Sequence, residues 1–372
     1  MQNPLEVQEL VDQCIDFLRD SPSDLKACAC VSRSWVAAAQ AHIFKEVSLL
    51  LWSPTGSKSG PQSAEKSWAR LRQVLTRSPH LIRHIHRLQL DSTAVSIEAF
   101  AAICEFPFTH LCYIFLRHLS ESFSLSIATQ KLVSHPTLRH MKIVADLSEA
   151  SSWIWDRCSP NLRHLELSCL WRSFQPNNTV PSHPRSTPIV LESLKTDSLE
   201  FIDAWLMQEM CPFDMSHLKI VSAEYGIDEL LHHRKFFPAL QKIKVLDFNP
   251  AADSPVDLST LTSLVLLRIT VVEQYDWQMA LDTLSTIVHP NRIRKIVISS
   301  TEYLPAECGL QLDSKLDSLP LHSLLTLELE RNIFEGGLTI SNASQYFPQM
   351  TSRQLLRITD REENWFENFA GV

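Results

Sequence analysis

Histidine and cysteine are the residues of this sequence that could ligate a metal or act as nucleophiles. The chain of 372 residues carries 15 histidines and 9 cysteines. His84 and His86 are separated by one residue, but no third ligand at a convincing spacing and no H-E-x-x-H motif accompanies them. The cysteines form no C-x-x-C pair, and Cys28-x-Cys30 lies in a helical pattern. We therefore expect reduced thiols and no metal site.

Glycine is scarce, and its scarcity excludes several kinds of phosphate-binding loop. The chain has 7 glycines, where average usage gives roughly 26. No G-x-G-x-x-G, G-x-x-x-x-G-K-[ST] or G-x-S-x-G motif occurs. We expect no catalytic residue, no cofactor and no enzymatic activity in this chain.

Charge and hydropathy restrict the partners and the compartment. The formal net charge is −8, which argues against a nucleic-acid-binding chain. No apolar run approaches the roughly 18 residues that a membrane span needs, and the N-terminus lacks the basic start of a signal peptide. We expect a cytoplasmic and/or nuclear protein with no nucleic-acid or membrane partner.

The first fifty residues predict three short helices followed by a strand. Apolar residues recur at helical spacing from Val7 to Leu18, again around Leu25 and Cys28, and again from Val31 to Ala39. Residues 44–49 alternate like a strand. Three short helices bury little surface alone, so this unit needs a partner or a neighbouring domain to cover its apolar residues.

These residues resemble the F-box. The matching segments are Pro4–Val7, Ile15–Leu18, Leu25–Trp35 and His42–Val47, so the resemblance covers residues 3–48. The one departure is Asn3, where the family usually has leucine; it removes one apolar contact with the partner. The alternative is a helical unit that only caps a repeat array and binds no adaptor.

The resemblance implies that residues 3–48 bind a Skp-type adaptor and, through it, a cullin ubiquitin ligase. In such assemblies the F-box contributes apolar helix faces, although some of these residues must also pack internally. The matching positions that we expect to bind the adaptor are Pro4, Leu5, Val7, Ile15, Leu18, Val31 and Trp35.

An apolar-x-x-apolar-x-apolar phrase recurs through the rest of the chain. Successive copies begin 24 to 31 residues apart, which is the leucine-rich-repeat period. A proline precedes most copies and would stop the preceding helix. The ten copies begin at Ile85, Leu111, Leu138, Leu162, Leu191, Met215, Leu240, Leu264, Ile293 and Leu324.

The array resembles irregular leucine-rich repeats, which implies an α/β solenoid with a parallel sheet on its concave face. We expect an F-box over residues 3–48, a linker and short helix over 49–78, the repeats over 79–345 and a C-terminal cap or tail over 346–372. Within these, residues 52–67 are predicted to be a flexible linker and residues 175–188 a loop. An alternating α/β domain is the structural rival.

Strand alternation sends two residues of each phrase to the concave face. Eight of these twenty positions are Lys or Arg, and Lys195, Lys219, Lys244 and Arg268 occupy the same position in four consecutive repeats. His140, His164 and His217 share one repeat phase and are predicted to be exposed. The expected substrate-binding residues are Lys142, Lys195, Lys219, Lys242, Lys244, Arg268 and Lys295.

The function expected from these features is that of a substrate-recognition adaptor in a Skp–cullin–F-box type ubiquitin ligase. The repeats would bind a protein substrate that is acidic or phosphorylated. For the basic positions, the alternative is an ordinary solvated strand face. For the whole chain, the alternative is a ligase-independent leucine-rich-repeat scaffold.

Overall fold

The chain folds into two compact units. The first comprises Met1–Leu162 and Cys169–Ser182, and the second comprises Arg163–Ser168 and His183–Val372. The computed structural model describes residues 8–50, 61–93, 95–119, 127–145, 157–169, 187–197, 206, 211–250, 255–272, 276–287, 292–300, 306–331 and 344–360.

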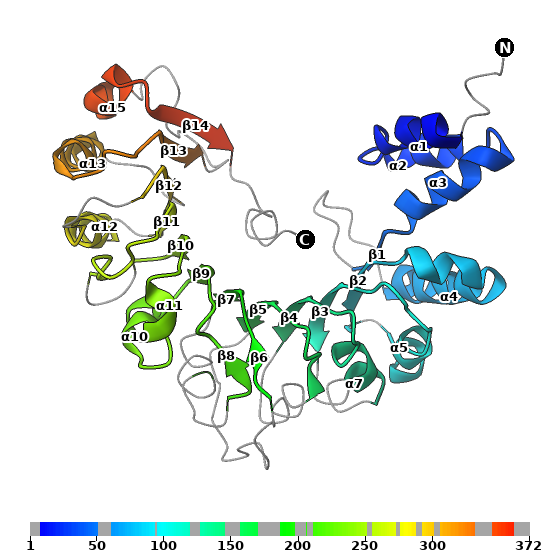
Figure 1. Ribbon diagram of the computed structural model, residues 1–372. Coiled ribbons are helices and arrows are strands. Elements are labelled where there is room, and N and C mark those ends of the chain that lie inside the picture. The colour runs from blue at the N-terminus through cyan, green and yellow to red at the C-terminus, as the bar shows by residue number, and fades with distance from the viewer. Residues whose placement is uncertain are drawn as a thin grey trace. The chain divides into compact units, whose positions relative to one another are not determined.

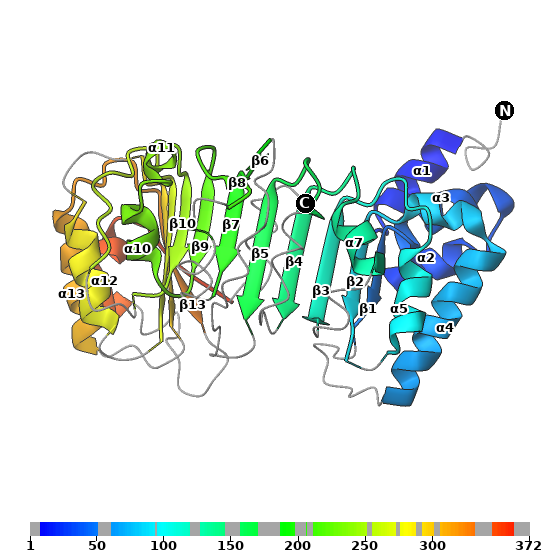
Figure 2. The same ribbon diagram turned by 90° about the horizontal axis from the view of Figure 1, so that it is seen from below.

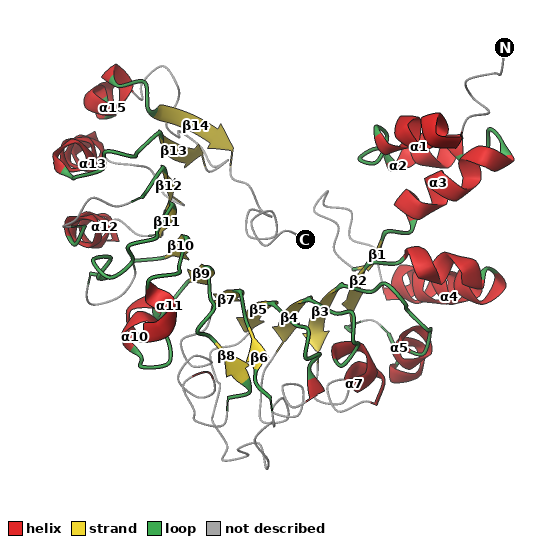
Figure 3. Cartoon of the chain, viewed as in Figure 1, coloured by secondary structure: helices red, strands yellow, loops and turns green. Residues whose placement is uncertain are grey.

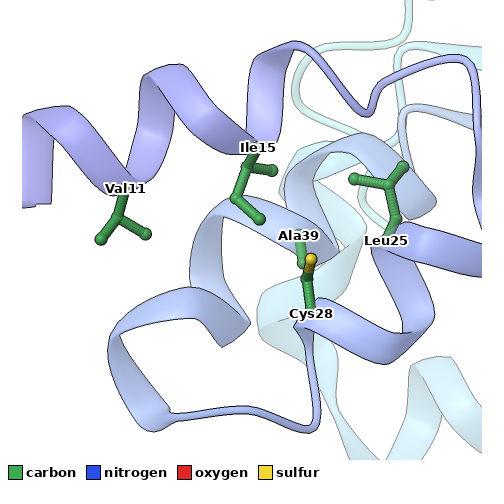
Figure 4. Packing of buried hydrophobic residues seen from close by; sticks show 5 residues of the cluster. All are labelled: Val11, Ile15, Leu25, Cys28 and Ala39. Atoms are coloured by element: carbon green, nitrogen blue, oxygen red, sulfur yellow. The ribbon is translucent and has the colours of Figure 1, made fainter. Parts of the chain in front are cut away.

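Three short helices begin the first unit, where the apolar spacing predicts them. They are α1 (Gln8–Asp16), α2 (Pro22–Cys28) and α3 (Arg33–Ile43). A polar contact joins α1 and α3: Nε2 of His42 on α3 lies 2.7 Å from a carboxylate oxygen of Asp16 on α1. Side chains from all three helices form one small core (Figure 4), made of Val11, Ile15, Leu25, Cys28 and Ala39.

The remainder of the first unit alternates parallel strands with helices. The strands are hydrogen-bonded in the order β1-β2-β3-β4, and the helices α4, α5 and α7 lie on one side of them (Figure 3). The elements are β1 (Glu46–Leu49), α4 (Pro61–Arg77), the 3-10 helix η2 (Pro79–His84), β2 (Arg87–Asp91), α5 (Ile97–Cys104), β3 (Tyr113–Leu119), α7 (Ile127–Val133) and β4 (His140–Ala145).

Helix α4 starts earlier than the sequence predicts. Residues 61–67 were expected in the linker, but they form the first two turns of α4. Pro61 occupies the first helical position, where its missing N–H is not needed. Further along the helix, Trp68 is buried, with its ring 5.8 Å from that of Phe100 on α5. Residues 52–60 of the expected linker lie outside the described residues.

The second unit repeats the same alternation. Its strands are parallel in the order β5-β7-β9-β10-β11-β12-β13-β14, with β6 and β8 paired separately. The helices lie on one side of the strands (Figure 1), and a second view shows strands β5 to β10 side by side (Figure 2). The elements are β5 (His164–Cys169), β6 (Ile189–Val190), β7 (Ser193–Thr196), β8 (Phe213–Asp214), β9 (Ile220–Ala223), α10 (Ile227–His232), α11 (Phe237–Leu240), β10 (Val245–Phe248), β11 (Leu266–Val271), α12 (Asp276–Ser285), β12 (Lys295–Ser300), α13 (Ala306–Ser318), β13 (Thr326–Arg331), α15 (Pro348–Ser352) and β14 (Leu356–Asp360).

The predicted alignment of the sixth and seventh repeats is wrong by three residues. Leu194 on β7 pairs with Val221 on β9, not with Leu218. Val221 then pairs with Leu246 on β10, and Leu246 with Leu267 on β11. Both repeats contain two overlapping apolar phrases spaced by three residues, so the sequence alone offers two registers. Pairing along the sheet selects the second, which brings one fully buried side chain from each strand into line.

The end of the repeat array is longer than predicted. Residues 346–360 were expected to form a cap, but they contain α15 and β14, which pairs with β13 in parallel. The carboxylate of Asp313, which is 1% exposed on α13, accepts hydrogen bonds of 2.8 and 2.9 Å from the backbone amides of Gln349 and Met350. The acidic aromatic segment after residue 360 lies outside the described residues.

A glycine allows the segment before α15 to approach α13 closely. A Cβ built at Gly309 would lie 2.9 Å from the Cβ of Tyr346, which is closer than real contacts allow. Gly309 and Asp313 are one helical turn apart on α13, so packing and hydrogen bonding act on the same junction.

Asp313→Ala should lower the free energy of unfolding by about 2–3 kcal/mol, because the buried backbone N–H of Met350 and the partly buried one of Gln349 lose their carboxylate acceptor. Denaturant unfolding of the full chain measures this. The control is Asp317→Ala, which removes only the exposed 3.2 Å ion pair with Arg353 and should cost less than about 1 kcal/mol. Equal effects of the two variants would contradict the buried-acceptor role.

Candidate functional site

The residues expected to bind an adaptor occupy different environments in the N-terminal helices. Ile15 is fully buried in their core, so it packs internally and offers no surface to a partner. Leu18 and Trp35 are half-buried against that core. Val31 is 65% exposed. The remaining expected residues, Pro4, Leu5 and Val7, lie outside the described residues.

The structure adds an exposed apolar stripe on α1 that the sequence analysis did not single out. Leu10 is 43% exposed, Phe17 is 89% exposed, and the thiol-bearing Cys14 between them is also exposed. Phe17 continues the helical turn, since its amide donates to the carbonyl of Gln13. Spacings of four and three residues place the three side chains on one helix face. Helical spacing alone groups Leu10 and Cys14 with Val11 and Ile15 in one apolar stripe, and the structure shows that the first two are exposed and the last two buried.

The strand face opposite the helices, called here the helix-free face, carries alternating charges in the second unit. One residue of each strand lies in its central row: Glu166, Lys195, Ser222, Asp247, Arg268, Val297, Glu328 and Arg357. The predicted ladder of four cations is therefore wrong. Lys195 and Arg268 belong to this row, but Ser222 and Asp247 stand where Lys219 and Lys244 were expected.

Arg268 is part of a buried network. Its side chain is 3% exposed, and one terminal nitrogen donates a short hydrogen bond to the carboxylate of Glu330. Its Nε lies 3.9 Å from the Asp247 carboxylate, which also accepts a 2.8 Å hydrogen bond from the Ser222 hydroxyl. A guanidinium neutralised in this way holds strands β9, β10, β11 and β13 together and has little surface with which to contact a substrate.

Lys295 is also neutralised by a neighbour on the helix-free face. Its Nζ lies 2.7 Å from a carboxylate oxygen of Glu328, which also accepts a 2.8 Å hydrogen bond from Thr359. Burial raises the pKa of Glu328, but the hydrogen bonds from Lys295 and Thr359 outweigh burial and hold that pKa below its usual value. The ion pair is therefore retained at neutral pH.

Three of the expected substrate-binding lysines lie at the amino ends of strands. Lys219 directly precedes β9, Lys244 directly precedes β10, and Lys242 lies two residues earlier; all three are exposed. Nζ of Lys219 lies 2.5 Å from Glu192, and this hydrogen bond lowers the pKa of the Glu192 carboxyl. Lys242 donates to the carbonyl of Ser216 at 2.7 Å.

In the first unit, the equivalent face combines aromatic rings with cations. Lys142, the seventh expected residue, places its ammonium 5.2 Å from the centre of the Phe115 ring. Arg87 covers the Tyr113 ring at 4.2 Å. His140 was expected to be exposed, but it is fully buried with its ring 4.7 Å from that of Tyr113. A large aromatic neighbour on the adjacent strand covers it.

His164 and His217, which were also predicted to be exposed, differ from one another in burial. His164 is half-buried, and its Nδ1 lies 2.7 Å from the Ser193 hydroxyl on the neighbouring strand. His217 is exposed, as predicted, but the corrected register places it before β9 and outside the phase of the other two.

Histidines gather near the amino ends of β2 and β3. The rings of His86 and His110 stack with centres 5.7 Å apart. Burial lowers the pKa of His86, and His110 and Lys45 lower it further. Burial likewise lowers the pKa of His84, assisted by Arg83 and the neighbouring histidines. Within the described part of the chain, no group of three or more His, Cys, Asp or Glu side chains is placed to hold a metal ion.

Comparison with known proteins identifies no relative: no family model matches the sequence, and no curated protein does so either. None of the helices in the described ranges is long and apolar enough to cross a membrane.

Arg268→Ala should destabilise the chain by about 3–5 kcal/mol, because it leaves Glu330 and Asp247 buried without their cation. The double variant Arg268→Leu with Glu330→Leu should be much less destabilising, since no charge of that pair remains buried. Thermal and denaturant unfolding measure both. A mild effect of Arg268→Ala, within about 0.5 kcal/mol as for surface changes, would contradict the network.

Stability should fall as the pH drops below the ordinary histidine pKa of 6.5. The folded pKa values of His84 and His86 are lowered, so the unfolded chain binds more protons in that window and gains relative stability there. His86→Gln should reduce this loss between pH of about 7 and about 5.5, measured as denaturant midpoints.

Proposed function

We propose that this chain is a substrate-recognition adaptor of a Skp–cullin–F-box type ubiquitin ligase. In this proposal the N-terminal helices act as an F-box that binds a Skp-type adaptor, and the repeats act as a leucine-rich-repeat-like array that binds a protein substrate. The chain itself makes and breaks no bonds. It raises the local concentration of the substrate's lysines near the ligase.

The exposed apolar stripe on α1 carries this proposal. Phe17 and Leu10 remain 89% and 43% exposed although α1 has already buried Val11 and Ile15 in its own core. Burying an aromatic or leucine side chain is worth about 1.5–3 kcal/mol, so a partner that covers both side chains would gain binding free energy. An F-box needs such a surface, whereas a helical cap that only closes a repeat array does not.

The repeat array supports the second half of the proposal. Parallel strands with helices on one side leave the helix-free face and the strand ends for a partner, as in other repeat proteins. The buried ion pairs of Arg268 support a structural role for the middle of that face. The exposed lysines at the strand ends, Lys219, Lys242 and Lys244, are therefore the better candidates for substrate contact.

Phe17→Asp should abolish co-purification of a co-expressed Skp-type adaptor with the full chain, because it places a charge in the proposed apolar interface. Folding should be unaffected, since Phe17 lies outside the core. Ser23→Asp is the matched control: it adds the same charge at an exposed position in the first turn of α2, where acidic residues are favourable.

Two outcomes of this experiment would overturn the proposal. If the wild-type chain retains no adaptor, the ligase role fails and the ligase-independent scaffold is favoured. If Phe17→Asp and Ser23→Asp retain the adaptor equally, the stripe on α1 is not the contact surface. Circular dichroism of both variants separates loss of binding from loss of folding.

A further inference from the structure

A row of exposed cations runs along the amino ends of the strands in the second unit. The residues that directly precede β9 to β13 are joined by backbone hydrogen bonds of 2.7–2.8 Å. The first runs from the amide of Lys244 to the carbonyl of Lys219, and the last from the amide of Leu325 to the carbonyl of Arg294. We call this set the amino-end row. From β9 to β13 its members are Lys219, Lys244, Val265, Arg294 and Leu325; the same bonding continues before β7 to Glu192, whose carbonyl accepts a 2.8 Å hydrogen bond from the Lys219 amide.

A second set of basic residues lies two positions earlier in the chain, before the same strands. His217, Lys242 and Arg292 are all exposed, and they precede Lys219, Lys244 and Arg294 respectively. Six basic side chains therefore surround the amino ends of β9, β10 and β12. This concentration is unusual in a chain of net charge −8.

Acidic neighbours neutralise little of this charge. Glu192 forms the 2.5 Å ion pair with Lys219. Among the residues that the structure describes, no carboxylate lies within ion-pair distance of Lys244, Arg292 or Arg294. The helix-free face differs, because Arg268 and Lys295 on it both have carboxylate partners. Arg268 is thus paired inside the sheet, whereas Lys244, Arg292 and Arg294 at the amino ends have no described carboxylate partner.

Such a row favours an anionic ligand. Adjacent strands are about 4.8 Å apart, so Lys219 and Lys244 stand beside each other with like charges. Solvent and salt reduce their repulsion without removing it. An anionic segment laid across the strands would reduce the repulsion and gain charge-assisted hydrogen bonds.

The apolar members of the row indicate what kind of anionic segment would fit. Val265 is half-buried and Leu325 is 65% exposed, and they lie on either side of Arg294 in the row. A nucleic-acid backbone offers phosphates to the cations but no matching apolar side chains. A peptide that alternates acidic and apolar residues satisfies both kinds of position.

We propose that the amino-end row binds an extended acidic peptide segment of a partner protein. The row from β9 to β13 spans about 19 Å, which an extended segment of roughly six residues covers. The proposal rests on the proposed function only in treating that segment as part of a ligase substrate. Carboxylates and phosphorylated side chains supply the same chemistry, and the test compares them.

The test measures binding of fluorescently labelled peptides to the purified full chain by fluorescence anisotropy. The probe alternates Glu and Leu; one counterpart replaces Glu with Gln, and another replaces one Glu with phosphoserine. We expect the Glu and phosphoserine probes to bind and the Gln probe to bind at least tenfold more weakly. Raising salt from about 0.05 M to about 0.5 M should weaken binding of both acidic probes.

The variant Lys244→Glu with Arg294→Glu should weaken binding of the Glu probe by about tenfold or more, because two attractive contacts become repulsive. Arg70→Glu with Arg72→Glu is the matched control. It changes net charge equally at exposed positions of α4 and should leave binding within a factor of about two. If the first variant unfolds, Lys244→Gln with Arg294→Gln is used, with an expected loss of about threefold or more.

Three results would overturn the proposal: unchanged binding by the folded row variant, equal binding of the Gln probe, or equal loss in the α4 control. A labelled single-stranded oligonucleotide that binds as tightly as the Glu probe, with the same loss in the row variant, would overturn the peptide assignment. The assay contains no Skp-type adaptor. Failure of adaptor co-purification would therefore leave peptide binding as a separate result.

Discussion

The register of the parallel strands is the constraint on which the rest of the second unit depends. One side chain from each of six neighbouring strands enters a single fully buried row: Leu194, Val221, Leu246, Leu267, Ile296 and Leu327. Exposing any one of these side chains would cost about 1.5–3 kcal/mol. The row therefore fixes every other position on each strand, including which charged residues face one another and which lie beyond the strand end.

This register separates the charges of the second unit into two groups with different roles. On the helix-free face, Arg268 and Lys295 face carboxylates from neighbouring strands. Arg268 is buried, and a buried cation without a partner would be very unfavourable. At the amino ends, Lys244 and Arg294 are exposed and remain hydrated. The first group stabilises the stack of strands, and the second is available to a partner at little cost to folding.

The N-terminal helices divide their apolar residues in a comparable way. Val11 and Ile15 of α1 lie in the core, whereas Leu10 of the same helix and Phe17 directly after it are exposed. Three short helices have too little volume to bury both sets. The helices therefore fold around one set and leave the other exposed.

Much of this protein follows from local sequence patterns. Helical spacing predicted α1, α2 and α3, and the repeating apolar phrase placed the eight strands β2, β3, β4, β5, β7, β11, β12 and β13, whereas its sixth and seventh copies lie three residues before the true register of β9 and β10. The cross-strand pairs of Tyr113 with His140 and of Arg268 with Val297 also follow from that phrase. These features depend on residues close together in the chain, so their spacing alone specifies them.

The tertiary structure alone decided the register of β9 and β10, the burial of Arg268 and His140, and the identity of the amino-end row. In the sixth and seventh repeats, two overlapping apolar phrases satisfy the local pattern equally well. The choice between them depends on Leu194 and Leu267, which lie on neighbouring strands more than twenty residues away. Local spacing cannot distinguish such alternatives, because the free energy that separates them comes from packing between repeats.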